Sequence, residues 1–82
     1  MESKLRVFFS PTCGHCRRAK EFLSKRGLDF EAFDVTSDND AYEEMKRITN
    51  GARSVPVLEI GGQILIGFDQ DKVEEALESI GA

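Results

Sequence analysis

The 82-residue chain contains few of the residues that stabilise or anchor a small protein without a packed core: it has two cysteines, one histidine, two prolines and no tryptophan. The opening residues, MESKLRVFFS, lack a basic segment followed by about 7–15 apolar residues, the pattern of a secretory signal. No apolar run approaches the roughly 18 residues that a membrane span needs. We therefore expect a cytoplasmic protein with no membrane partner, in a reducing compartment that disfavours structural disulfides.

Positive charge is also scarce, because 11 Lys and Arg face 15 Asp and Glu and give a net charge of −4. Nucleic-acid-binding domains usually carry a basic stripe, so we expect no nucleic-acid partner and interpret the acidity as a hydrated surface. The hydrophobic fraction of 40% is typical of a folded chain rather than a disordered one. A chain of this length has room for one core, and we predict a single domain over residues 1–82.

The apolar pattern predicts alternating strands and helices in the first two thirds of the chain. Residues 5–9 are a β-branched and aromatic run, which predicts a strand. Apolar residues then recur with helical spacing as far as Gly27, a typical helix terminator. Residues 29–35 predict a second strand, and a second helix is expected to begin at Ser37 or Asp38, which are both good N-caps.

The last third predicts a hairpin and a helix. Two apolar runs, 55–60 and 63–68, are joined by Gly61-Gly62, a strong hairpin signal. Residues 69–80 combine helical apolar spacing with acidic residues in the first turn. The predicted order is therefore βαβαββα, an α/β fold. A right-handed crossover makes the first two strands parallel and the hairpin adds antiparallel strands, so we expect a four-stranded mixed sheet with three helices.

The segment FFSPTCGHC holds both cysteines and the histidine. Cys13 lies at the predicted strand-to-helix junction, where unpaired backbone N–H groups and the helix dipole stabilise a thiolate. Cys16 lies one turn further on the same helix face. These positions are typical of thiol–disulfide exchange, in which Cys13 attacks and Cys16 resolves the mixed disulfide. His15 can become cationic near neutral pH and stabilise the thiolate, although an exposed helix residue without this role is the alternative.

Metal binding is the alternative interpretation of the cysteines, and it would place the protein in another functional class. A closed structural zinc site takes four ligands, and the sequence has no further cysteine or histidine, so we expect no metal site within one chain. Two chains could still share a zinc ion or an iron–sulfur cluster through Cys13. A structural Cys-x-x-Cys disulfide closes too short a loop to add much stability.

Val55-Pro56 opens the third predicted strand, a position where a sheet tolerates proline. A cis bond would turn the Val55 backbone towards the cysteines, but the residues alone do not decide the isomer. In their order and spacing, FFSPTCGHC, SVP and GF-D resemble the glutaredoxin family of the thioredoxin fold over essentially the whole chain. The resemblance implies the sheet order 2-1-3-4, a cis Pro56 and an exposed, nucleophilic Cys13.

The resemblance also implies glutathione contacts from three loops, made by Thr12, Cys13, Arg53, Val55, Gly67, Phe68 and Asp69. Arg53 is expected to meet a carboxylate and Asp69 the γ-glutamyl ammonium, although a plain loop charge and a helix N-cap are the alternatives. The Val55 backbone is expected to pair with the cysteinyl backbone. Phe68, Val55 and Pro56 are expected to form an apolar rim for substrate, with core packing as the alternative for part of Phe68 but not for Pro56.

The chain departs from the family pattern at three places. Gly14-His15 is the middle pair typical of protein disulfide isomerases, whereas glutaredoxins usually have Pro-Tyr. Ile66-Gly67 replaces the family's Gly-Gly, so Ile66 is expected to crowd the glutathione site. A lysine common just upstream of the nucleophile is absent, with Ser10 in its region.

The segment GF-x-x-D, formed by Gly67, Phe68 and Asp71, also resembles small redoxins that serve ribonucleotide reductase and are reduced by thioredoxin reductase. We therefore expect a monomeric thiol–disulfide oxidoreductase that reduces protein disulfides or glutathione mixed disulfides. It needs no bound cofactor, and its electron donor is glutathione as cosubstrate or thioredoxin reductase. A disulfide donor or isomerase, and a cluster-carrying module of another class, are the alternatives.

Overall fold

The computed structural model describes residues 5–51 and 55–81. Its elements follow the predicted order: β1 (Leu5–Phe9), α1 (Gly14–Lys25), β2 (Glu31–Asp34), α2 (Asn39–Ile48), β3 (Val57–Ile60), β4 (Gln63–Ile66) and α3 (Gln70–Ser79). The strands form one sheet in the order β2-β1-β3-β4, in which β1 and β2 are parallel and the other neighbours antiparallel. The predicted α/β fold and the 2-1-3-4 order are therefore confirmed.

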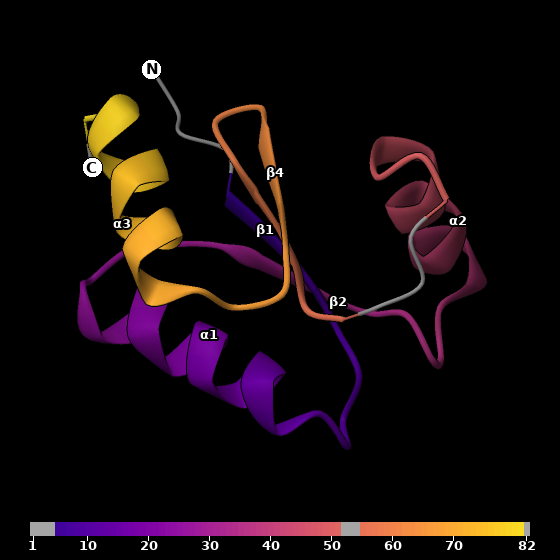
Figure 1. The fold of residues 1–82 in the computed structure, drawn as a ribbon. Helices are drawn as coiled ribbons and strands as arrows, with labels where there is room; N and C mark the ends of the chain where they lie inside the picture. Colours follow the sequence, from indigo (N-terminus) through magenta and orange to yellow (C-terminus); the bar gives the residue numbers. More distant parts are fainter. Residues whose placement is uncertain (1–4, 52–54, 82) are drawn as a thin grey trace.

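The sheet separates two apolar cores. Figure 1 shows α1 and α3 on one side of the sheet and α2 on the other. Because successive strand residues point to opposite faces, Val7 packs in the core beneath α1 and α3, whereas Phe8 packs against α2. On the helices, Leu23 and Met45 are buried at the centre of the apolar faces that their spacing predicts. Burial of each such side chain contributes about 1.5–3 kcal/mol to folding.

Helix ends are set by the residues that the sequence indicates. The Asp38 carboxylate caps α2 by accepting from the backbone N–H groups of Asp40 at 3.0 Å and Ala41 at 3.2 Å. α1 ends before Gly27, whose φ of 72° lies in the left-handed region that favours glycine. The hairpin turn at Gly61 packs against the end of α3, where an added Cβ would collide with the Ile80 side chain. None of the described helices is long and apolar enough to cross a membrane.

β2 is shorter than predicted, because only Glu31–Asp34 have strand partners. β2 is an edge strand, and its parallel register against β1 runs from Arg6 opposite Glu31 to Phe9 opposite Asp34. The Val35 N–H still donates to the Phe9 carbonyl at 3.0 Å, so pairing ends where β1 ends. This end of β1 leads directly into the segment that carries the cysteines.

Candidate functional site

A tight turn brings the chain from β1 to Cys13. The Cys13 N–H donates to the Ser10 carbonyl at 3.1 Å, with Pro11 at the second position of the turn, where proline is favoured. The Ser10 hydroxyl lies 3.1 Å from the Thr12 hydroxyl and accepts from the Thr12 N–H at 3.4 Å. Sequence reasoning missed this contribution of Ser10, although a Ser-Pro pair between a strand and a helix is itself a turn signal.

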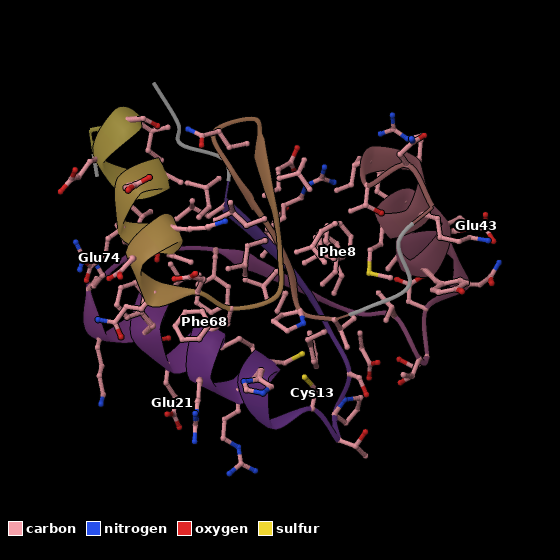
Figure 2. All side chains as sticks on the ribbon, in the orientation of Figure 1. Phe8, Cys13, Glu21, Glu43, Phe68 and Glu74 are labelled. Carbon is pink, nitrogen blue, oxygen red and sulfur yellow. The ribbon has the colours of Figure 1, made fainter. Side chains whose placement is uncertain are left out.

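Cys13 is the N-cap of α1. Its backbone is extended, with φ −93° and ψ 114°, and its Sγ accepts a hydrogen bond from the Cys16 N–H at 3.2 Å. The side chain is half-buried and lies at the start of α1 (Figure 2). The N-terminal end of a helix favours negative charge, so the position stabilises a thiolate at Cys13 while leaving its sulfur open to substrate.

Cys16 lies in a different environment, with only 1% of its surface exposed. Burial is the largest cause that raises the pKa of its thiol to about 11, and a hydrogen bond to the Cys13 side chain adds to it. A backbone group of Ser10 and the charge of Lys20 act in the opposite direction. Cys16 therefore keeps its proton at neutral pH. An accessible sulfur at a helix start beside a buried, protonated thiol suits two-step thiol–disulfide exchange.

Two further loops meet the cysteine segment. The Val55–Pro56 bond is cis, as the resemblance implies, and the Val55 carbonyl oxygen lies 3.8 Å from the Cys13 Sγ. The Gly67 N–H donates to the Pro56 carbonyl at 2.7 Å, which joins the loop after β4 to the loop before β3. Residues near Cys13, Val55 and Gly67 are thus brought together from three distant parts of the sequence.

The expectation that Pro56 forms an exposed apolar rim is wrong for its side chain. Less than 2% of its surface is exposed, so it belongs to the packed interior. The position of Pro56 explains the difference, since it directly precedes the buried start of the central strand β3 and its carbonyl accepts from the Gly67 N–H in the loop after β4. Val55, by contrast, is half-buried and is available at the rim.

The third loop carries Phe68 and Asp69. Phe68 is half-buried and packs on Phe22 of α1 with the ring centroids 5.7 Å apart, as core packing predicts for part of its ring; in Figure 2 it lies between α1 and the start of α3. Asp69 is exposed and caps α3 by accepting from the Asp71 N–H at 3.1 Å. The N-cap role of Asp69 is therefore confirmed, and its carboxylate remains accessible to solvent beside the loop.

The other predicted positions have different outcomes. Thr12 and His15 are exposed beside Cys13, and no hydrogen bond or ion pair joins His15 to any residue that the structure describes. Arg53 lies outside the described residues. Ile66 is 55% exposed and sits opposite Val57 at the end of β4. Over residues 5–51 and 55–81, no group of three or more His, Cys, Asp or Glu side chains could hold a metal ion.

Comparisons with known proteins agree with this arrangement. The family model for glutaredoxin matches residues 5–65. The chain is 31% identical to a glutaredoxin-like 8.6 kDa protein in the rubredoxin operon of Clostridium pasteurianum, over 90% of this chain and 97% of that protein. Among solved structures, a thioredoxin-like protein aligns with a TM-score of 0.84 at 31% identity, over 90% of this chain and 100% of that one.

A second solved structure is the glutaredoxin-like NrdH-redoxin from Escherichia coli, described as having a thioredoxin-like activity profile. It aligns with a TM-score of 0.77 at 26% identity, over 88% of this chain and 92% of that one. The family model covers most of the chain, and the relative from Clostridium pasteurianum matches it almost from end to end. The protein therefore belongs to the glutaredoxin family of thiol–disulfide oxidoreductases.

Proposed function

We propose that the protein reduces disulfides of protein substrates through Cys13 as nucleophile and Cys16 as resolving thiol. The observation that carries the proposal is the contrast between the two sulfurs. The Cys13 Sγ accepts from a helix N-terminal N–H and belongs to a half-buried residue, whereas Cys16 is buried with a pKa raised to about 11. A nucleophile must be accessible and ionised, and a resolving thiol can stay protonated until the mixed disulfide has formed.

The reaction proceeds in two exchanges. The Cys13 thiolate attacks one sulfur of the substrate disulfide; a Cys13–substrate bond forms, the substrate S–S bond breaks, and the first substrate sulfur leaves as a thiolate and takes up a proton. Cys16 then gives up its proton and attacks the Cys13 sulfur, which releases the second substrate thiol. The substrate gains two electrons, and the Cys13–Cys16 pair is oxidised to a disulfide.

The buried proton of Cys16 has a use in this sequence. A thiolate that leaves beside Cys16 needs a proton, and Cys16 must lose one to become a nucleophile. Transfer from Cys16 to the leaving sulfur would meet both needs without bulk solvent. His15 is exposed, directly precedes Cys16 and, when cationic, would stabilise negative charge on Cys13 from the solvent side.

Two electron donors are compatible with the site. For glutathione, the Val55 carbonyl 3.8 Å from the Cys13 Sγ offers a backbone partner, and the exposed Asp69 carboxylate offers a partner for the γ-glutamyl ammonium. Thr12, Gly67, Phe68 and Arg53 complete the expected glutathione set. For a thioredoxin reductase, support comes from the similarity to NrdH-redoxin and from Ile66, whose exposed side chain stands where the family's glycine leaves room.

The deciding experiment measures NADPH consumption during reduction of the Cys13–Cys16 disulfide, with either glutathione plus glutathione reductase or thioredoxin reductase. Turnover with glutathione would establish a working glutathione site; turnover with thioredoxin reductase alone would establish the redoxin alternative. Cys13→Ser is the control and should turn over with neither. Absence of turnover by the unmodified protein with both donors would contradict the proposal. The protein is proposed to act as a monomer without a resident cofactor, in a reducing compartment such as the cytoplasm.

A further inference from the structure

The charge of α1 is opposite to that of the rest of the molecule. The chain has a net charge of −4, yet α1 carries four basic residues, Arg17, Arg18, Lys20 and Lys25, against a single acidic one, Glu21. α3 shows the reverse composition, with four acidic residues and one lysine. The helix that begins at the reactive cysteine is therefore a basic surface on an acidic protein.

Most of this charge is not used inside the molecule. Arg17, Arg18 and Lys25 are exposed, and no described residue forms an ion pair or hydrogen bond with their side chains. Lys20 lies over the Phe9 ring, with its Nζ 3.7 Å from the ring centroid, and anchors the surface to β1. Figure 2 shows Glu21 pointing away from the sheet among nitrogen-tipped side chains that extend from α1 into solvent.

Several of these side chains, although not Arg18, border a shallow hollow on the surface of α1. This shallow hollow, called the groove below, is open to solvent, has a volume of about 400 Å³ and is lined by one face of α1 alone: Arg17, Lys20, Glu21, Ser24 and Lys25. It starts at the residue after Cys16 and ends in the last turn of the helix. At about 1.5 Å per residue, Arg17 and Lys25 are about 12 Å apart along the axis, which is the length of about four extended residues.

We propose that this groove docks a short acidic segment of the partner protein whose disulfide reacts at Cys13. The proposal rests on the proposed function and adds the class of partner: a protein with Asp or Glu residues near its reactive cysteine. Unpaired cations attract carboxylates, and a segment held along α1 brings a neighbouring cysteine of the same chain to Cys13.

A protein segment fits the groove better than a nucleic acid does. Glu21 lies within the groove, and α3, on the same side of the sheet as α1, carries four acidic residues, so an extended polyanion would meet repulsion beyond α1. A short acidic segment with carboxylates only where the cations lie avoids this repulsion. The groove thus favours local acidic charge over continuous negative charge.

The experiment compares three peptides that differ only in the residues flanking one cysteine, which are acidic, neutral or basic. The cysteine of each peptide is activated as a mixed disulfide with thionitrobenzoate, and the absorbance of the released thionitrobenzoate gives the second-order rate constant. The net charge of −4 alone predicts that the basic peptide reacts fastest. The groove predicts the opposite order, with the acidic peptide about 10-fold faster than the neutral one at an ionic strength of about 0.01 M.

Salt provides the first control. The Debye length falls from about 30 Å at an ionic strength of 0.01 M to about 3 Å at 1 M. The acidic peptide should therefore react only about 2-fold faster than the neutral one, or less, at 1 M. A wild-type order of basic over acidic, or no preference at low salt, would overturn the proposal. A failure to release thionitrobenzoate from the neutral peptide would instead count against the proposed function, so the two failures are distinguishable.

Charge-reversal variants test whether the preference for the acidic peptide arises at the groove on α1. Lys25→Glu should reduce the acidic preference, the ratio of the acidic-peptide to the neutral-peptide rate constant, at least 3-fold, because the substitution replaces a cation of the groove with an anion. Lys46→Glu on α2 changes the net charge equally and should keep the preference. Equal losses in both variants would mean that net charge, not the groove, sets the preference. Equal inhibition by a single-stranded oligonucleotide and by an acidic peptide without cysteine would assign the groove to polyanions and also overturn the proposal.

Discussion

The raised pKa of Cys16 makes the stability of the reduced protein depend on alkaline pH. In the folded protein the thiol keeps its proton up to about pH 11, whereas its ordinary pKa is 9.0. Between these values unfolding releases a proton, so the free energy of unfolding falls as pH rises. The contribution is fully present below about pH 9. Each pKa unit corresponds to about 1.4 kcal/mol, so about 1.4 kcal/mol is lost by pH 10 and up to about 3 kcal/mol above pH 11.

Urea unfolding of the reduced protein and of Cys16→Ala, at about pH 7, 8 and 10, measures this effect. Both proteins contain the same other ionisable groups, so the contributions of those groups cancel in the difference between the two. We expect the stability advantage of the unmodified protein to be equal at pH 7 and 8 and to shrink by about 1.4 kcal/mol at pH 10. An advantage that stays constant to pH 10 would refute the reasoning. Repeating the comparison of Cys16 with Cys16→Ala in a Cys13→Ser background separates the effect of burial on the pKa of Cys16 from the effect of Cys13.

Three further predictions concern the proposed site. Cys13→Ser should abolish exchange with every disulfide, whereas Cys16→Ser should accumulate mixed disulfides that intact-protein mass spectrometry detects; equal loss without trapped species would contradict their assigned roles. Asp69→Ala should cost about 1 kcal/mol of stability through loss of the α3 cap and Asp69→Asn much less. Both should raise the KM for glutathione, and an unchanged KM would remove Asp69 from the glutathione set. Ile66→Gly should raise glutathione-dependent turnover several-fold without changing the rate with a small neutral disulfide, and an unaltered turnover would show that Ile66 is no barrier.

Local chemistry explains why the elements were predictable. Asp38 and Asp69 have side chains that satisfy helix N–H groups, and both are N-caps in the structure. Leu23 repeats the apolar spacing of α1 and is buried there, and Gly61-Gly62 supplies the positive φ values of the hairpin turn. Each of these outcomes depends on residues within about four positions, which is the range over which a sequence pattern acts.

The outcomes that were not predictable depend on residues far apart in the chain. The Cys13 Sγ lies 3.8 Å from the carbonyl of Val55, and no local pattern sets this separation. Pro56 is buried where the loop before β3 meets the loop after β4, which the hydrogen bond from the Gly67 N–H to the Pro56 carbonyl joins. The basic residues of α1 follow the cysteines directly in the sequence. The sequence does not show which of them have partners in the fold, where Lys20 lies over the Phe9 ring of β1.

The length of α1 separates the two classes of partner. Lys25 is twelve positions after Cys13, or about 18 Å along a helix. Glutathione is a tripeptide attached through its central cysteine, so its ends reach at most about 7 Å from that residue. Glutathione bound at Cys13 therefore cannot use Lys25, whereas a protein segment of about six or more residues can. A substitution at Lys25 that slows a protein substrate and leaves glutathione-dependent turnover unchanged would show that this redoxin recognises proteins by contacts that no small thiol can make.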